Sequence, residues 1–177
     1  NKPGTVGCFL PGIQTTLLPV PGIEDGGKLI VKGPNIMSGY LKADQPGKLQ
    51  PPENQTYDTG DIVSIDSEGF VTIKGRVKRF AKIAGEMISL SAVEKMVLEA
   101  WPSINHAVVS INDPKKGEAL VLFTEQKSPN RADLVKHAKN IGFAELGIPK
   151  KIIEIEKIPV LGTGKVDYVS LQKRAES

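Results

Sequence analysis

The pattern of residues changes near Gly75, and this change constrains the fold more than any other feature of the sequence. Residues 1–75 are rich in glycine and proline and contain short apolar runs such as VGCFL and KLIV, which predicts an all-β segment. Residues 80–177 alternate strand-like runs with helical patterns, which predicts a small sheet with helices packed on it. We therefore expect an α+β chain of two units, joined by a hinge at residues 76–79.

Individual elements follow from local patterns. Two β-runs in DIVSIDSEGFVTIK (61–74), with turn-forming residues between them, predict a hairpin. Ser91 and Glu94 have the spacing of a capping box and predict a helix at 90–101. Ser128 and Pro129 are expected to begin a second helix as N-cap and first helical residue. Further elements are expected as strands at 106–111, 119–124 and 151–158 and a terminal helix from about Asp167.

Composition excludes little. The net charge of +3 is too small to indicate nucleic-acid binding, and the few aromatic residues are not interleaved with the basic ones as stacking platforms would be. The single cysteine, Cys8, lies in an apolar run and is expected to be a small buried residue. The chain does not begin with Met, and we expect it to be part of a longer protein.

Three segments carry residues that are suited to chemistry. In LGTGKVD (161–167) two glycines flank Lys165, although this loop alone is more typical of a solvated lysine in a surface turn. In YDTGDI (57–62) the carboxylate of Asp61 can accept hydrogen bonds from two adjacent hydroxyls, as in a ribose, or simply cap the turn. The basic segment at 75–94 predicts a hinge and a loop that faces an anionic partner, or a solvated linker. Neither His106 nor His137 has neighbours at metal-ligand spacing, so no metal site is expected.

Taken together and in order, these segments resemble the adenylate-forming superfamily of acyl-CoA synthetases, nonribosomal-peptide adenylation domains and luciferases. The matching segments are GKLIVKGPNIMSGYLKAD, YDTGDI, GRVKRFAKIAGEMISLSAVE, AVVSINDPKKGEALVLF and IPVLGTGKVD. Within the superfamily, AKIAGEMISL and KGEALVLFTE are most similar to the bifunctional acyl-[acyl-carrier-protein] synthetase/2-acylglycerophosphoethanolamine acyltransferases.

The resemblance implies that residues 1–75 are the end of a large amino-terminal domain and residues 80–177 a small mobile carboxyl-terminal domain. It implies an ATP-dependent ligase that joins a fatty acid, through an acyl-adenylate, to the phosphopantetheine thiol of acyl carrier protein or to coenzyme A. The phosphate loop and the Mg²⁺ site would lie in the rest of that large domain, so the chain alone is expected to be inactive. The parent enzyme is expected on the cytoplasmic side, associated with an inner membrane.

The resemblance also implies roles for individual residues. Lys165 would be the catalytic lysine, and Lys78, where many members have Asp, the hinge residue. The other implied sites are Asp61 and Arg76 at the ribose, and Arg79, Lys82, Gly85 and Glu86 on the face for the thiol arm and carrier protein, where Lys115 and Lys116 add positive charge. The alternative function is a non-catalytic module that docks an acidic carrier protein.

Overall fold

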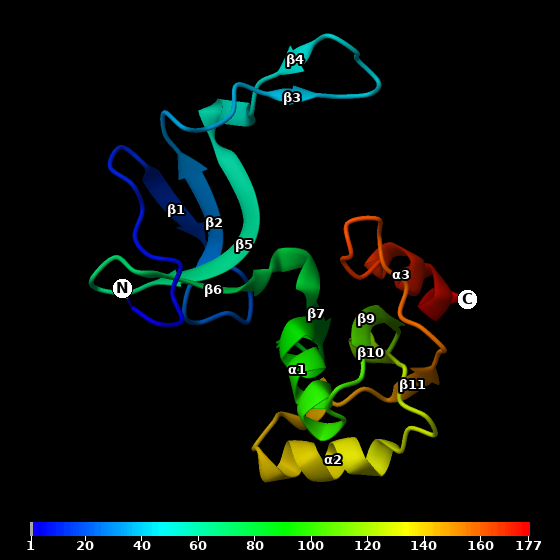
Figure 1. Cartoon of the computed structure of the whole chain (residues 1–177). Coiled ribbons are helices and arrows are strands. Elements are labelled where there is room, and N and C mark those ends of the chain that lie inside the picture. Colours follow the sequence, from blue (N-terminus) through cyan, green and yellow to red (C-terminus); the bar gives the residue numbers. More distant parts are fainter. Residues whose placement is uncertain (1) are drawn as a thin grey trace. The chain divides into compact units, whose positions relative to one another are not determined.

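The computed structural model describes residues 2–177, which form two compact units (Figure 1). The first unit ends at Lys78, and the second runs from Arg79 to Ser177. The first is built from strands, whereas the second combines a five-stranded sheet with three α-helices. The predicted α+β class, with an all-β segment followed by a sheet that carries helices, is confirmed. No helix among residues 2–177 has both the length and the apolar character needed to cross a membrane.

The first unit contains a four-stranded antiparallel sheet. Its strands lie in the order β1 (Gln14–Leu18), β2 (Gly27–Lys32), β5 (Tyr57–Ile65) and β6 (Val71–Arg76). The predicted hairpin is confirmed, because β5 and β6 pair from Ile65↔Val71 to Asp61↔Arg76. The side chain of Asp66 closes the turn by accepting from the backbone N–H of Phe70 at 2.9 Å. The small core of this sheet is formed by Leu29, Val63 and Val71.

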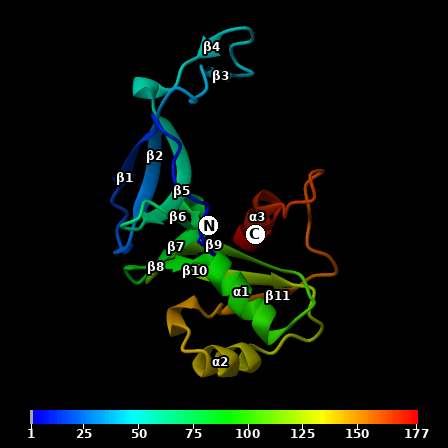
Figure 2. The ribbon, with the colours of Figure 1, turned by 60° about the vertical axis from the view of Figure 1, so that its left-hand side comes forward.

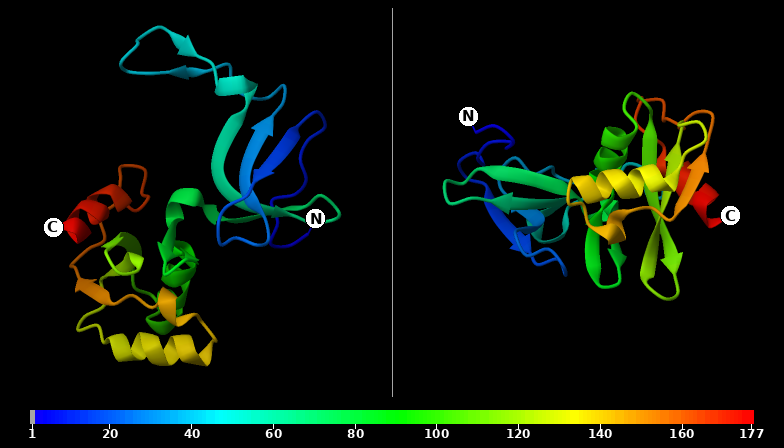
Figure 3. Two further views of the ribbon diagram at one scale, coloured as in Figure 1. Left: turned by 180° about the vertical axis from the view of Figure 1, so that it is seen from behind. Right: turned by 90° about the horizontal axis from the view of Figure 1, so that it is seen from below.

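A second, shorter hairpin lies beyond the amino-terminal end of β5 (Figure 3). It consists of β3 (Tyr40–Leu41) and β4 (Leu49–Gln50), and the 3₁₀ turn η1 (Glu53–Gln55) leads from it into β5. Its apolar side chains are open to solvent, with Leu41 72% exposed. The hairpin therefore contributes nothing to the core of the first unit.

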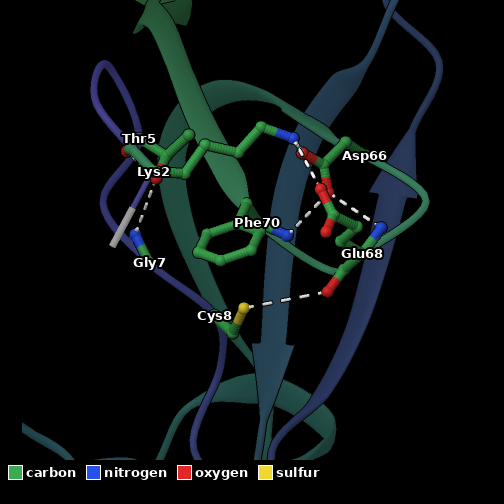
Figure 4. A network of polar contacts seen from close by, with 7 residues as sticks. All are labelled: Lys2, Thr5, Gly7, Cys8, Asp66, Glu68 and Phe70. Carbon is green, nitrogen blue, oxygen red and sulfur yellow. Dashed lines mark hydrogen bonds and ion pairs between the residues drawn. The ribbon is translucent and has the colours of Figure 1, made fainter.

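Cys8 is exposed, so the prediction that it is buried is wrong. The run VGCFL forms no strand of its own, but it lies along the start of β6. The Val6 N–H donates to the Val71 carbonyl, and the Val71 N–H donates to the Gly7 carbonyl, both at 2.9 Å. The next residue, Phe9, packs on the core, and the alternation of an extended segment turns Cys8 outward. Its Sγ lies 3.9 Å from the Glu68 carbonyl oxygen (Figure 4).

Lys2 fastens the amino-terminal segment to the β5–β6 turn. Its ammonium lies 2.6 Å from Asp66 Oδ2 and 2.9 Å from Glu68 Oε2 (Figure 4). The hydrogen bond from Lys2 holds the pKa of the Asp66 carboxyl below its usual range. Asp66 therefore stays ionised and keeps both the turn and the amino-terminal segment in place.

The second unit has β10 (Gly117–Thr124) at its centre. This strand pairs antiparallel with β9 (His106–Asp113) along its whole length and parallel with β11 (Lys151–Glu154), and it meets β7 (Phe80–Ile83) at Gly117. The remaining elements are η2 (Val77–Arg79, which spans the unit boundary), β8 (Glu86–Ser89), α1 (Leu90–Ala100), α2 (Arg131–Asn140), η3 (Glu145–Gly147) and α3 (Tyr168–Glu176).

Both faces of β9 and β10 are buried, and this explains their nearly unbroken apolar sequences. Val108 and Leu122 belong to a core cluster that includes residues of α1 and α2. The alternate residues Val109 and Phe123 belong to a second cluster with residues of α3. Because neighbouring side chains of a strand point to opposite faces, α3 covers one face of the sheet and α1 and α2 the other (Figures 1 and 2).

The helix predicted at 90–101 is confirmed, but its cap is not Ser91. The N-cap is Ser89, whose hydroxyl accepts from the Ala92 N–H at 3.3 Å, so Ser91 is already helical and exposed. Glu94 closes no capping box with Ser91 and points instead to side chains of other elements. The strand β8 ends at Ser89 and α1 begins at the next residue, so the helix starts before Ser91, the serine of the predicted capping box.

Two other predicted boundaries shift. The second helix begins at Arg131 with Asn130 as its N-cap, not at Pro129 with Ser128. The Asn130 side chain accepts from the Ala132 N–H at 3.0 Å, whereas Ser128 has φ +48 and lacks the extended conformation of an N-cap residue. The strand expected at 151–158 ends at Glu154. The terminal helix begins as predicted, with Asp167 as its N-cap.

The choice of N-cap for α1 can be tested with a matched pair of serines. We expect Ser89→Ala to lower the free energy of unfolding of the second unit by about 1 kcal/mol, because an N–H of the first turn loses its acceptor. Ser91→Ala should change it by less than about 0.5 kcal/mol. Trp101, the single tryptophan, lies at the end of α1 and reports urea unfolding of this unit by fluorescence. A larger loss for Ser91→Ala than for Ser89→Ala would restore the capping box.

Candidate active site

Asp61 and Arg76 are brought together in the first unit. They are paired across β5 and β6, and Arg76 Nε lies 2.8 Å from Asp61 Oδ1. The Asp61 side chain is only 19% exposed, whereas that of Arg76 is 63% exposed, and Arg76 Nη1 also donates to the Thr59 carbonyl at 2.6 Å. This ion pair occupies Oδ1, so Oδ2 is the oxygen that can accept from a bound hydroxyl group.

The residues before Asp61 lie in an irregular, bulged stretch of β5, and not in the turn expected from the sequence. Gly60 has φ +70, a left-handed conformation that suits glycine, and the Thr59 hydroxyl accepts from the Asp61 N–H at 3.1 Å. Lys28 and the Gly60 N–H both donate to Asp58, and the hydrogen bond from Lys28 holds the pKa of that carboxyl below its usual range. The conformation of this bulge is therefore held by side-chain contacts on both sides of Gly60.

A small hollow of about 180 Å³ lies beside Asp61 within the first unit. Asp61 supplies the charge in its lining, and the other lining residues are Val6, Gly7, Cys8, Phe9, Leu29, Val63, Val71 and Ile73. One carboxylate at an apolar floor is the arrangement expected for a ligand with hydroxyl groups on an apolar body.

Lys165 stands on a tight turn between β11 and α3. Val160 and Val166 form an isolated antiparallel β-bridge at its base. The Leu161 N–H donates to the Lys165 carbonyl, and the Gly164 N–H donates to the Leu161 carbonyl, both at 2.8 Å. Gly164 has φ +79, so the turn itself requires a glycine there. Lys165 is exposed and makes no ion pair with residues 2–177, so its ammonium is free to meet an anionic ligand.

The predicted hinge residue, Lys78, is exposed and is the last residue of the first unit. Lys82, Gly85 and Glu86 lie exposed on the β7–β8 hairpin that follows. Both residues of its two-residue turn have positive φ, +52 at Ala84 and +94 at Gly85, as in a type I′ turn. The Ala84 N–H donates to the Lys116 carbonyl at 2.8 Å, which places the β9–β10 turn beside this hairpin.

Arg79 does not share this exposure. Its side chain is 17% exposed, and its guanidinium donates to Glu94 Oε1 at 2.7 Å and to the Val108 carbonyl at 2.8 Å. It also lies over the ring of Tyr168, 3.8 Å from the ring centroid. The expectation that Arg79 faces a partner is therefore corrected, because its donors and its planar face are bound within the second unit.

Glu94 and Tyr168 were missed by sequence reasoning as site residues. The spacing of Glu94 from Ser91 suggested a local cap, and nothing in the sequence near Tyr168 points to a partner 74 positions away. One usable signal was that Leu90 and Val97, four residues before and three residues after Glu94, are apolar, which predicts a carboxylate near the covered face of α1.

The two histidines have different surroundings within the second unit. The ring nitrogens of His106 lie 2.9 Å from Thr124 Oγ1 and 3.0 Å from the Trp101 carbonyl, and burial lowers the pKa of the ring. His137 Nε2 lies 3.5 Å from Glu99 Oε2. Within the described part of the chain, no three His, Cys, Asp or Glu side chains gather as a metal site.

Comparison with known proteins finds relatives that are named as ligases. The vibriobactin-specific 2,3-dihydroxybenzoate-AMP ligase of Vibrio cholerae is 32% identical over 162 residues, 90% of this chain and 30% of the relative. The 2-succinylbenzoate–CoA ligase of Staphylococcus epidermidis is 35% identical over 150 residues, 82% of this chain and 31% of the relative. The chain thus spans about a third of the length of these curated relatives.

A solved structure shows the same arrangement of elements. ATP-bound MatB from Rhodopseudomonas palustris matches 99% of this chain and 36% of its own, with a TM-score of 0.75 and 26% sequence identity. No model of a protein family matches the chain. From these relatives and from the fold, the chain belongs to the adenylate-forming ligase superfamily and corresponds to a carboxyl-terminal portion of its members.

Proposed function

We propose that the chain is the carboxyl-terminal part of an ATP-dependent acid–thiol ligase, which works with a larger nucleotide-binding domain. The observation that carries this proposal is the ammonium of Lys165, exposed and without an ion pair to residues 2–177, on a turn whose base is fixed by backbone hydrogen bonds. A cation held in this way stabilises charge without having to reorganise during the reaction. Relatives named as an AMP ligase and a CoA ligase support the reaction class.

The first half-reaction needs such a cation. A carboxylate oxygen of the acid attacks the α-phosphorus of ATP, and pyrophosphate leaves, so that two anions approach each other. Lys165 would contact both the carboxylate and the α-phosphate and reduce their repulsion. Asp61 would accept hydrogen bonds from the ribose hydroxyls through Oδ2, while Arg76 holds Oδ1. Mg²⁺ would be bound outside this chain and supply further positive charge at the phosphates.

The second half-reaction needs a different face. A thiolate attacks the acyl carbon of the adenylate and releases AMP, and Lys165 would have to withdraw to make room. Rotation about Lys78, at the boundary between the units, would replace the Lys165 turn by the β7–β8 hairpin. Gly85 at the tip of that hairpin carries no side chain, and even a Cβ at this position would meet no heavy atom within 4 Å. This open space leaves room for a phosphopantetheine arm.

The acceptor is proposed to be the phosphopantetheine of acyl carrier protein or coenzyme A, and the acid a fatty acid. The cations Lys82, Lys115 and Lys116 suit an acidic carrier protein, because the β7–β8 and β9–β10 turns that bear them are joined by a backbone hydrogen bond. A hollow of about 250 Å³ near these turns has an apolar floor of Ile83, Leu120 and Ile148. Its charged lining residues balance, with Lys116, Arg131 and Lys150 against Asp113, Glu118 and Glu145, so the hollow adds no net charge to that of the exposed lysines. The same charge is the observation that favours a carrier-docking module as the alternative function.

The finer assignment rests on the resemblance to the bifunctional acyl-[acyl-carrier-protein] synthetases. Under it, the parent protein would act in fatty acid and phospholipid metabolism on the cytoplasmic side of an inner membrane, with an acyltransferase region outside this chain. A fatty acid as substrate separates this assignment from the aryl acids in the names of the relatives above.

Substitution of the lysine tests the role of the turn. In the full-length protein we expect Lys165→Ala to slow ATP–pyrophosphate exchange with a fatty acid by about 100-fold or more, because the transition state loses its cation. Thioester formation from supplied acyl-adenylate should change little. Lys157→Ala, an exposed lysine of the same connection, is the matched control and should leave both steps unchanged. Equal losses in both half-reactions would refute the role of Lys165.

Whether adenylation requires the larger nucleotide-binding domain can be tested with residues 1–177 alone. We expect residues 1–177 alone to show no ATP–pyrophosphate exchange, because the residues that hold the β- and γ-phosphates lie outside this chain. The measurement is exchange of labelled pyrophosphate into ATP with a fatty acid, beside the full-length protein at equal concentration. Robust exchange by the chain alone would contradict the domain assignment. Carrier-protein binding by a full-length protein that lacks exchange would favour the docking module.

A further inference from the structure

Arg79, Glu94 and Tyr168 converge with the backbone of Val108 in a group that we call the Glu94 node. Glu94 Oε1 accepts from Arg79 Nη2 at 2.7 Å, from the Val108 N–H at 2.8 Å and from the Tyr168 hydroxyl at 3.1 Å. The Tyr168 hydroxyl also lies 3.3 Å from Oε2. One carboxylate therefore joins the start of the second unit to α1, β9 and α3.

The node closes the outer edge of β9. This strand pairs with β10 only, so its other edge presents backbone groups without a strand partner in residues 2–177. At Val108 the N–H donates to Glu94 and the carbonyl accepts from Arg79. Because α1 covers one face of the sheet and α3 the other, the contact between Glu94 and Tyr168 ties the two helical layers together around this edge.

The contacts of the Glu94 node include a largely buried ion pair and a cation–π contact. The Arg79 and Glu94 side chains are only 17% and 19% exposed, and removal of either one would leave the other charged and poorly solvated. Arg79 also stacks on the face of Tyr168. Burial, and then the charge of Glu94, raise the pKa of Tyr168, so its hydroxyl keeps its proton and remains a donor.

Two ends of the node lie next to residues of the proposed reaction. Arg79 directly follows Lys78, and Tyr168 comes three residues after Lys165. Between Lys165 and Tyr168, the Asp167 N–H donates to the Pro159 carbonyl at 2.9 Å, and its carboxylate accepts from the Ser170 hydroxyl at 2.6 Å. The connection from the hinge residue to the base of the lysine turn is thus a continuous set of short contacts.

On the basis of the function proposed above, we infer that Arg79, Glu94 and Tyr168 are positioning residues for Lys165. They fix the base of the lysine turn to the first residue after Lys78, so that rotation at Lys78 carries the turn as part of one rigid body. None of them needs to touch the substrate. Without these contacts, the Lys165 ammonium would be displaced from the position where charge develops in the transition state. A displacement of about 1 Å can lower the rate of the chemical step by two orders of magnitude.

The test uses two conservative variants of the full-length protein. Tyr168→Phe keeps the ring under Arg79 but removes the donor to Glu94, and Glu94→Gln keeps the shape but removes the charge. The matched control is Gln172→Met, which removes a 2.8 Å hydrogen bond from the same helix to the Ser110 carbonyl of β9 without touching the node. Each half-reaction is measured separately, with palmitate and ATP for the first and with supplied palmitoyl-adenylate and coenzyme A for the second.

We expect kcat for pyrophosphate exchange to fall by about 10-fold or more in Tyr168→Phe and Glu94→Gln, with KM for ATP and the second half-reaction within about twofold of the parent. Gln172→Met should leave all three unchanged. A purely structural role would lower both half-reactions together through the fraction of folded protein. Unchanged exchange in Tyr168→Phe, or equal loss in both half-reactions, overturns the positioning role.

Lys165→Ala separates this inference from the proposed function. If that variant loses exchange while Tyr168→Phe does not, the ligase assignment stands and the node is only structural. If Lys165→Ala retains full exchange, the catalytic role of Lys165 fails and the positioning role fails with it. If the unsubstituted full-length protein shows no exchange with any acid, the proposed function itself fails. If Glu94→Gln does not fold, Tyr168→Phe decides the question, because it removes a single hydroxyl.

Discussion

The second unit depends on the burial of β9 and β10 on both faces. Alternate side chains of these strands serve two separate cores, one shared with α1 and α2 and the other with α3. A sheet covered in this way holds in fixed places the helices that begin or end near the residues proposed to be reactive. It also leaves one problem, the open edge of β9, and the Glu94 node covers that edge at Val108 while it joins the two helical layers.

This arrangement gives the Lys165 turn an unusual combination of properties. Its tip is exposed and carries an ammonium without an ion pair in the described part of the chain, whereas its base is held by the Val160–Val166 bridge and by the cap of α3 at Asp167. A catalytic cation needs both properties, because it must reach a ligand and must not reorganise when charge develops. In the first unit, the same logic applies to Asp61, whose carboxylate is held by Arg76 on the neighbouring strand.

Much of this was predictable from the sequence, and the exceptions have physical causes. The β5–β6 hairpin, the helix near 90–101 and the start of α3 at Asp167 followed from local patterns, and the superfamily followed from five ordered motifs. The errors arose where tertiary contacts override local signals. Ser128, whose N–H donates to Glu154, has φ +48 and does not cap the second helix, and Glu94 turns to Arg79 and Tyr168 rather than to Ser91. Such contacts join residues far apart in sequence, and no local spacing reveals them.

If Lys165 enters the nucleotide site during adenylation, a bound adenylate analogue should shield its ammonium from chemical labelling. The full-length protein is acetylated briefly with and without a non-hydrolysable palmitoyl-adenylate analogue, and each lysine is quantified by mass spectrometry. We expect the analogue to protect Lys165 strongly, while the labelling of Lys157, on the same connection, stays unchanged. Equal labelling of Lys165 in the two samples, at saturating analogue, would show that Lys165 does not enter the site.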